Sequence, residues 1–218
     1  GIYRLLKDSC NSIKKIIYAS TLEVYGLPKE VPITESHPTE PLSFYGLSKL
    51  AGEKIVSIFC RRNSIKYTIL RFSNVFGPGE IFERAIPNFI KASIKGKNIT
   101  IFGDGKQTRS FCYVTDQIEG LLRLAWFDEC KGEVVNIGNP NEITILELAK
   151  IVREITNSNS KIKFHPPMPD DPRRRCPDIT KAKNLLNWIP KVKLEKGLKR
   201  TVKWFREVSN RSLINRRV

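Results

Sequence analysis

The feature that most constrains this fold is an alternation of strand and helix patterns within the first third of the chain. Residues 15–20, KIIYAS, are mostly β-branched or aromatic and end in small residues, as a buried parallel strand does before a loop. Residues 44–62 carry apolar side chains at helical spacing, and residues 67–72, YTILRF, form a second strand pattern before the turn at Gly77. This order predicts an α/β fold in which a crossover helix joins parallel strands.

The rest of the chain continues the alternation less regularly. Further strands are predicted at 99–102 and 133–137, and further helices at 114–127, 143–156, 180–187 and 194–208. Asn141 and Thr144 are the candidate caps of the helix at 143–156. A length of 218 residues fits one domain or two small ones.

The chain is strongly basic, since 38 lysines and arginines against 22 acidic residues leave a net charge of +16. Such a charge attracts nucleic acids, anionic membranes or phosphorylated small molecules. The basic residues are scattered, no nucleic-acid recognition motif accompanies them, and no apolar run reaches the roughly 18 residues of a membrane span. We therefore expect a solvated basic surface, with neither nucleic acid nor membrane as a partner. A nucleic-acid binder is the alternative that charge alone would support.

Cysteine and histidine usage argues against several kinds of site. The five cysteines are widely separated and form no Cys-x-x-Cys pair, so neither a disulfide framework nor a zinc site is indicated. His37 and His165 are the only histidines and lie in proline-flanked loops, which supports neither a metal cluster nor a Ser-His-Asp hydrolase. This usage fits a reducing compartment, and we expect a cytoplasmic protein.

The first pair with chemical meaning is Tyr45 and Lys49, in the segment YGLSK. Four residues apart on a helix, their side chains share one face. A neighbouring ammonium favours the charged phenolate, which makes the tyrosine a usable general base. Chance often produces the same spacing as an exposed amphipathic pair, so the context decides. The strand at 15–20 delivers Thr21 and Glu23 at its carboxyl end, where sites form in open α/β sheets.

Six longer segments follow one another over nearly the whole chain: YASTLEVYG, PLSFYGLSKLAGEK, LRFSNVFGPG, IFGDGKQTRSFCYVTD, VVNIGNP and DDPRRRCPDITKAKNLLNW. In this order they resemble the motifs of NAD-dependent nucleotide-sugar epimerases, dehydratases and decarboxylases of the extended short-chain dehydrogenase/reductase family. The resemblance implies a Rossmann-type doubly wound parallel sheet with a smaller C-terminal α/β substrate-binding domain. It also implies NAD as cofactor, a UDP-sugar as substrate and a homodimer at full length.

The resemblance also implies residue roles. Tyr45 would be the catalytic base, Lys49 would hold the nicotinamide ribose, and Thr21 would bind the reacting sugar hydroxyl. Ser20 would contact the cofactor together with Tyr45 and Lys49, and Glu23 would belong to the catalytic group. The reaction would begin with oxidation of sugar carbon 4 by NAD, which gives a 4-keto sugar.

A second set of residues would bind the nucleotide sugar. By resemblance, the residues at the sugar, the diphosphate and the base are Asn74, Asn88, Phe102, Arg109 and Arg175. Arginine forks bind phosphate oxygens bidentately, which suits a doubly charged diphosphate. Two structural alternatives stay open, a core position for Phe102 and a backbone-capping role for Glu23.

Leu22 and Glu23 narrow the choice of reaction. Dehydratases that expel the 6-hydroxyl carry an acid at the position of Leu22, and a leucine cannot protonate a leaving hydroxide. A carboxylate at Glu23 is typical of decarboxylases as well as dehydratases, whereas simple 4-epimerases usually have none. PLSFYGLSKLAGEK is more like the 4-epimerases, while GDGKQTRSFCYV and DDPRRRCPDITKAK are more like the UDP-glucuronate decarboxylases. A UDP-sugar 4-epimerase is the leading hypothesis, with a UDP-glucuronate decarboxylase and a non-catalytic nucleotide-sugar-binding fragment as alternatives.

The Gly-rich turn that holds the NAD pyrophosphate in such proteins has no match here. We therefore expect the N-terminal strands of the doubly wound sheet to be missing, roughly the first 90 to 100 residues of a dinucleotide domain. Residues 1–78 and 111–137 are predicted to form the rest of the NAD-binding domain. Residues 79–110 and 138–218 are predicted to form the nucleotide-sugar-binding domain.

Overall fold

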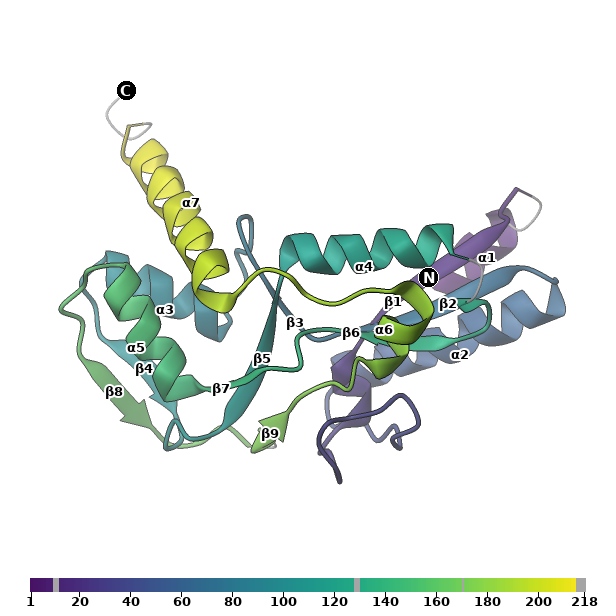
Figure 1. The fold of residues 1–218 in the computed structure, drawn as a ribbon, viewed down its shortest axis with the longest axis horizontal. Helices are drawn as coiled ribbons and strands as arrows, with labels where there is room; N and C mark the ends of the chain where they lie inside the picture. Colours follow the sequence, from purple (N-terminus) through teal and green to yellow (C-terminus); the bar gives the residue numbers. More distant parts are fainter. Residues whose placement is uncertain (10–11, 128–129, 170, 215–218) are drawn as a thin grey trace.

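The computed structural model describes residues 1–9, 12–127, 130–169 and 171–214, and it has two lobes side by side (Figure 1). The helices are α1 Ile2–Ser9, α2 Phe44–Arg62, α3 Ala85–Ile94, α4 Val114–Trp126, α5 Ile145–Ile155, α6 Thr180–Leu186 and α7 Leu194–Ile214, with the 3-10 turn η1 Leu22–Tyr25. The strands are β1 Lys15–Thr21, β2 Lys66–Phe72, β3 Asn74–Phe76, β4 Ile99–Phe102, β5 Thr108–Tyr113, β6 Val134–Ile137, β7 Glu142–Thr144, β8 Ile162–His165 and β9 Arg174–Arg175.

Strands β1, β2 and β6 form a parallel sheet in that order. Ser20 of β1 lies opposite Arg71 of β2, which lies opposite Asn136 of β6, so the three strands end at the same edge. Helix α2 connects β1 to β2, and α4 precedes β6. The predicted α/β class, with parallel strands joined by a crossover helix, is confirmed.

Helices cover both faces of this sheet. Alternate residues of β2 point to opposite sides, so its apolar side chains pack against helices on each face. Ile69 packs in one cluster with Leu6 of α1 and Val56 of α2. Leu70 packs in another with Leu124 of α4. Because both faces are covered, the strand is an almost continuous apolar run rather than an alternating one. The sheet is therefore the middle layer of a doubly wound arrangement (Figure 1).

The second lobe has its core among α3, α5 and α7 (Figure 1). Strand β5 pairs with β3, β7 and β9, and β4 pairs with β8. Phe76 of β3 packs edge-on against Phe111 and Tyr113 of β5. Because β3 begins two residues after β2 ends, this lobe starts at the carboxyl edge of the parallel sheet.

The sequence located the helices α2, α4, α5, α6 and α7 and the strands β1, β2, β4 and β6, but it did not predict α3, β3, β5, β7, β8 or β9. Helix α2 covers the predicted 44–62. The helix predicted at 143–156 begins only at Ile145, because Glu142–Thr144 pairs with β5 as a strand. Thr144 caps this helix through a reciprocal pair of bonds with Glu147, which settles the choice between the two candidate caps. The division of the chain into two domains stays a prediction.

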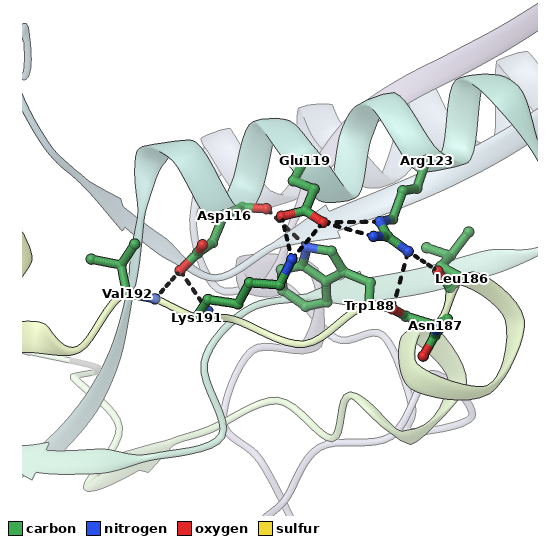
Figure 2. Close-up of polar contacts among 8 residues, drawn as sticks. All are labelled: Asp116, Glu119, Arg123, Leu186, Asn187, Trp188, Lys191 and Val192. Atoms are coloured by element: carbon green, nitrogen blue, oxygen red, sulfur yellow. Dashed lines mark hydrogen bonds and ion pairs between the residues drawn. The ribbon is translucent and has the colours of Figure 1, made fainter.

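A polar clamp joins α4 to the connector between α6 and α7 (Figure 2). It consists of Asp116, Glu119 and Arg123 on α4, of Leu186 at the end of α6, and of Asn187, Trp188, Lys191 and Val192 on the connector. The buried Asp116 carboxylate accepts hydrogen bonds from the backbone N–H groups of Lys191 and Val192 at 3.0 and 2.8 Å. The Asp116 carbonyl accepts another from Trp188 Nε1. These bonds fix the direction in which the chain enters α7.

Several kinds of feature are absent from the described ranges. No helix there is both long and apolar enough to cross a bilayer. No group of three or more histidine, cysteine, aspartate or glutamate side chains there could hold a metal ion. Four cysteines, Cys60, Cys112, Cys130 and Cys176, are buried and form no disulfide, and Cys10 lies outside the described residues.

Candidate active site

Helix α2 can lie close to β1 and η1 because two of its inward positions have no side chain. A Cβ at Gly46 would stand 2.8 Å from the carbonyl oxygen of Glu23. A Cβ at Gly52 would stand 2.1 Å from the hydroxyl of Tyr18. Both contacts are far shorter than side-chain atoms tolerate, so the sequence of α2 sets its distance from the strand. One face of α2 is therefore held against the carboxyl end of β1.

Tyr45 and Lys49 project from that face into a pocket of about 300 Å³, here called the catalytic pocket. Lys49 Nζ donates to the carbonyl oxygen of Ala19 at 2.9 Å and lies 5.8 Å from the centre of the Tyr45 ring. Thr21 and Glu23 line the same pocket from the end of β1 and from η1. The structure thus brings together the four residues predicted to be catalytic.

The η1 turn sets the directions of Thr21 and Glu23. Thr21 Oγ1 accepts a hydrogen bond from the backbone N–H of Glu23 at 3.3 Å and so caps the turn. The Glu23 carboxylate accepts a hydrogen bond from Ser43 Oγ at 3.1 Å. Leu22, between the two, is buried. Thr21 therefore caps the turn, whereas Glu23 accepts a side-chain hydrogen bond from a hydroxyl and lines both this pocket and a neighbouring one.

A second pocket of about 1100 Å³, here called the large pocket, adjoins the catalytic pocket and shares part of its wall. The residues common to both include Glu23, Asn74, Arg84 and Arg175. All five residues predicted to contact the nucleotide sugar line the large pocket: Asn74, Asn88, Phe102, Arg109 and Arg175. Phe102 is 46% exposed, so the alternative of a core phenylalanine is wrong. The volume is sufficient for a ligand the size of a nucleotide sugar.

Arg109 and Arg175 give the large pocket its capacity to bind an anion. They lie opposite each other on β5 and β9. Burial lowers the pKa of Arg175, and the charge of Arg109 lowers it further. Arg109 pairs with Asp171, whereas Arg175 Nε is buried and has no hydrogen-bond partner among the described residues. Two neighbouring guanidinium groups with an unused buried donor fit a diphosphate.

Two charged residues that no motif singled out also line the large pocket. Arg84 is the N-cap residue of α3 and reaches the catalytic pocket as well. Burial raises the pKa of Glu80 to about 7, against the opposing charges of Arg84 and Lys91. Glu80 Oε2 is buried and has no partner among the described residues. Recognising α3 from its apolar spacing at Ile86, Phe89 and Ile90 would have pointed to this wall.

The catalytic pocket fits the nicotinamide end of NAD. Ser20 and Ser73 line it beside Tyr45 and Lys49. Ser73 Oγ is buried without a partner among the described residues and is available to a bound amide. Ser20 Oγ donates to Glu53 at 2.5 Å, and its contact with the cofactor stays a prediction.

A tyrosine with a lysine neighbour, placed at the carboxyl edge of a parallel sheet beside an arginine-lined pocket, is typical of the short-chain dehydrogenase/reductase class. Comparison with known proteins agrees. The model of the family described as GDP-mannose 4,6 dehydratase matches residues 1–201. The chain belongs to this family of NAD-dependent nucleotide-sugar epimerases and dehydratases, which are enzymes.

The names of individual relatives indicate different reactions. UDP-glucuronic acid decarboxylase 4 of Arabidopsis thaliana is 42% identical over 203 residues, which are 88% of this chain and 45% of that protein. The structure of the UDP-glucose 4-epimerase of Thermotoga maritima, solved with UDP-glucose, has a TM-score of 0.89 at 36% identity. The match covers 94% of this chain and 68% of the epimerase chain. The structure of the UDP-glucuronic acid 4-epimerase of Bacillus cereus, solved with UDP-glucuronic acid and NAD, has a TM-score of 0.89 at 33% identity. This match covers 95% of this chain and 67% of that epimerase chain.

These comparisons confirm the expected family, its Rossmann-like fold and NAD as the family's cofactor. The chain spans about half the length of the decarboxylases it matches. Both decarboxylases and epimerases stand among the relatives, so the family alone does not choose the reaction.

Proposed function

We propose that this chain carries the catalytic residues of an NAD-dependent UDP-glucuronate decarboxylase. The observation that carries the proposal is the place of Glu23, an acidic residue, in the wall of the catalytic pocket together with Thr21 and Tyr45. Simple 4-epimerases usually lack a carboxylate at this place. Decarboxylases from Arabidopsis thaliana, Danio rerio and Xenopus tropicalis, 36–42% identical to this chain, give further support. The proposal reverses the order in which the sequence motifs ranked the two reactions.

Tyr45 is the base in this proposal. Its phenolate takes the proton of the sugar 4-hydroxyl while the hydrogen on carbon 4 leaves as a hydride, for which bound NAD supplies the acceptor. The Lys49 ammonium, close to the Tyr45 ring, favours the phenolate form. Thr21 Oγ1 holds the 4-hydroxyl in line with the base. The chain's own contribution is therefore position and charge.

Oxidation at carbon 4 prepares the loss of carbon dioxide. The carboxylate of glucuronate is attached to carbon 5, so a ketone at carbon 4 makes the sugar a β-keto acid. When the bond to the carboxylate breaks, its electron pair moves toward the carbon 4 oxygen and carbon dioxide leaves. A proton from water is then added at carbon 5. The hydride returns to carbon 4 while Tyr45 gives its proton back to the carbon 4 oxygen, which gives a UDP-pentose and restores the phenolate. Glu23, held by Ser43, lies where it can orient the sugar ring during these steps.

A UDP-sugar 4-epimerase is the second candidate function. The epimerase reaction shares the first step, the oxidation of carbon 4. It differs because the 4-keto sugar then rotates within the pocket, so that the hydride returns to the opposite face of carbon 4. The epimerase structures with TM-scores of 0.89 support this candidate. The volume of the large pocket also favours it, because the sugar needs room to turn.

One assay separates the two reactions. The 218-residue polypeptide and a fusion protein, in which a relative's N-terminal dinucleotide-binding segment precedes it, are incubated with NAD and each UDP-sugar. Release of carbon dioxide from UDP-glucuronate supports the decarboxylase. Interconversion of UDP-glucose and UDP-galactose, or of UDP-glucuronate and its 4-epimer, without that release supports the epimerase. Turnover of none of these by either protein would contradict both.

A non-catalytic nucleotide-sugar-binding module is a third candidate, favoured by the unused Arg175 donor in the large pocket. Titration calorimetry with UDP tests it. Binding at micromolar UDP, without NAD binding and without turnover in the fusion protein, would support such a module. Absence of UDP binding would exclude it.

The homodimer expected from the family is also a proposal. Leu47, Ala51, Lys54 and Ile58 form an exposed stripe at helical spacing along α2. We propose that this stripe packs against its copy in a second chain. Sedimentation of the fusion protein should give a dimer, and Leu47→Asp should give a monomer. A monomeric parent protein would contradict the proposal.

A further inference from the structure

Three polar side chains are buried together behind the catalytic pocket. Ser20 of β1, Glu53 of α2 and Arg71 of β2 are only 3%, 4% and 5% exposed, and we call them the buried polar cluster. Removing charges from water is costly, so groups of this kind persist only where they satisfy one another. None of the catalytic roles described above uses Glu53 or Arg71.

Glu53 is the centre of the buried polar cluster. Its Oε1 accepts hydrogen bonds from Ser20 Oγ at 2.5 Å and from Arg71 Nε at 2.9 Å. Its Oε2 accepts a third from the Arg71 guanidinium at 2.7 Å. A bidentate arginine–carboxylate pair fixes direction as well as distance. Ser20 and Arg71 face each other in the register of β1 and β2, so Glu53 ties α2 to both strands at one point.

Two members of the cluster adjoin catalytic residues in the chain. On α2, Tyr45, Lys49 and Glu53 follow at intervals of four residues and share one face. On β1, Ser20 directly precedes Thr21. The bond between Ser20 and Glu53 therefore joins the strand residue next to Thr21 to the helix turn next to Lys49.

The third member reaches the turn that carries Glu23. The guanidinium of Arg71 lies 4.7 Å from the centre of the Tyr25 ring, and Tyr25 belongs to η1. The Tyr25 hydroxyl donates to Asn136 Oδ1 at 2.9 Å, which holds the ring in place. Burial by itself would lower the pKa of Arg71, but the hydrogen bonds and charge of Glu53, together with Tyr25, outweigh it and raise the pKa. Arg71 therefore stays charged in its buried position.

Stability does not account for such a pair. Replacing a buried ion pair by apolar side chains of similar volume is often neutral or stabilising, because the desolvation of both charges is avoided. Apolar side chains fill space but impose no direction. The pair fixes the orientation of α2 relative to β1 and η1, and the catalytic side chains come from those three elements.

We propose that Glu53 and Arg71 are positioning residues, which align Tyr45 and Lys49 of α2 with Thr21 and Glu23 at the end of β1. The inference rests on the proposed function for its catalytic consequence. Its structural content, the orientation of Tyr45, is independent of which UDP-sugar is converted.

The test is a double variant of the fusion protein, Glu53→Leu with Arg71→Met, which removes the pair and keeps the volume. We expect the thermal midpoint to stay within a few degrees of the parent and the UDP affinity to stay within about twofold, since neither residue lines the large pocket. Turnover should fall by about 100-fold, as misplacement of catalytic groups by about 1 Å does. Arg71→Lys keeps the charge but loses the fork and should lower turnover by about tenfold.

The control is the clamp pair on α4, replaced in the same way by Glu119→Leu with Arg123→Met. It lies outside both pockets, and turnover should not change. A folded Glu53→Leu/Arg71→Met variant with the parent's turnover would overturn the proposal. If that variant fails to fold, Arg71→Lys decides, because parent-like turnover in folded Arg71→Lys would overturn it equally.

A second readout needs no activity. Tyrosine labelled with ¹³C at the ring carbon bearing the hydroxyl gives a Tyr45 resonance, assigned by its loss in Tyr45→Phe. We expect this resonance to shift or broaden in the Glu53→Leu/Arg71→Met variant and to stay unchanged in the clamp control. If the parent converts no UDP-sugar, the proposed function fails while this spectrum still decides the positioning role. An unchanged Tyr45 resonance in the double variant would overturn it.

Discussion

Tyr45 and Lys49 carry separate tasks in the proposed reaction, and the tyrosine hydroxyl is the group that can be removed with the least disturbance. Tyr45→Phe should lower turnover of the fusion protein by about two to four orders of magnitude, as loss of a general base does. UDP affinity should stay unchanged, because Tyr45 does not line the large pocket. Steady-state kinetics and calorimetry measure the two effects. Tyr3→Phe, on the exposed part of α1, is the control and should leave both unchanged. Parent-like turnover in Tyr45→Phe would contradict the assignment.

Glu80 predicts a pH dependence of stability. Its folded pKa of about 7 lies above the ordinary 4.5, so the folded protein binds this proton more tightly than the unfolded chain does. Ionising the buried Glu80 carboxyl destabilises the folded protein. This cost is absent below about pH 4.5 and complete above about pH 7, so the free energy of unfolding falls as the pH rises between these values. Glu80→Gln should lack this fall. Denaturant unfolding of parent and variant at pH 5 and pH 8 measures it, and equal stability differences at both pH values would contradict the prediction.

The sequence identifies the proposed catalytic residues more readily than the other residues that line the two pockets. Tyr45 and Lys49 are visible because one helix turn separates them, and Thr21 and Glu23 because they end a strand pattern. Glu80 and Arg84 have no such signal, since they become pocket residues only when α3 packs beside β4. The partner of Glu53 is likewise set by the β1–β2 register, not by distance along the chain.

At the scale of elements, the clamp on α4 predicts unequal effects from two acidic residues one turn apart. Asp116→Ala leaves two backbone N–H groups of the connector without their acceptor and should lower the free energy of unfolding by about 1–3 kcal/mol. Glu119 pairs with Arg123 and Lys191 near the surface, so Glu119→Ala should cost less than about 1 kcal/mol. Urea unfolding of both variants measures the difference (Figure 2). A larger loss from Glu119→Ala would mean that the charges, and not the backbone bonds, hold the connector.

Element lengths explain part of what the sequence-based predictions missed, although α3 with ten residues and β5 with six were missed as well. Helix α2 has 19 residues and strand β2 has seven, long enough for their periodicities to be recognised. Strands β3, β7 and β9 have three, three and two residues, too few for any period to show. They exist because β5 offers them backbone partners, which is a tertiary effect. For this reason the helix predicted at 143–156 includes Ile143 and Thr144, which belong to β7.

The whole molecule has a net charge of +16, and several of its cations line the large pocket. These are Arg84, Lys91, Arg109 and Arg175. An anionic ligand such as UDP gains from this field, and the gain is screened by salt. The remaining cations are scattered along the sequence, and the solvated basic surface without a nucleic-acid partner stays a prediction.

The arrangement of the parallel sheet leads to the last prediction. Among the described residues, strand β1 is an outer strand that pairs with β2 alone, and its Ala19–Thr21 end lines the catalytic pocket. An apolar edge strand invites association, and the NAD pyrophosphate needs a Gly-rich turn and a helix N-terminus, which these 218 residues do not supply. The 218-residue polypeptide alone should therefore show no turnover, tend to aggregate and bind NAD weakly. The fusion protein should stay dispersed and bind NAD. Fluorescence quenching by NAD and light scattering measure the contrast between the two proteins. Saturable binding of micromolar NAD by the polypeptide alone would show that another part of the chain holds the pyrophosphate.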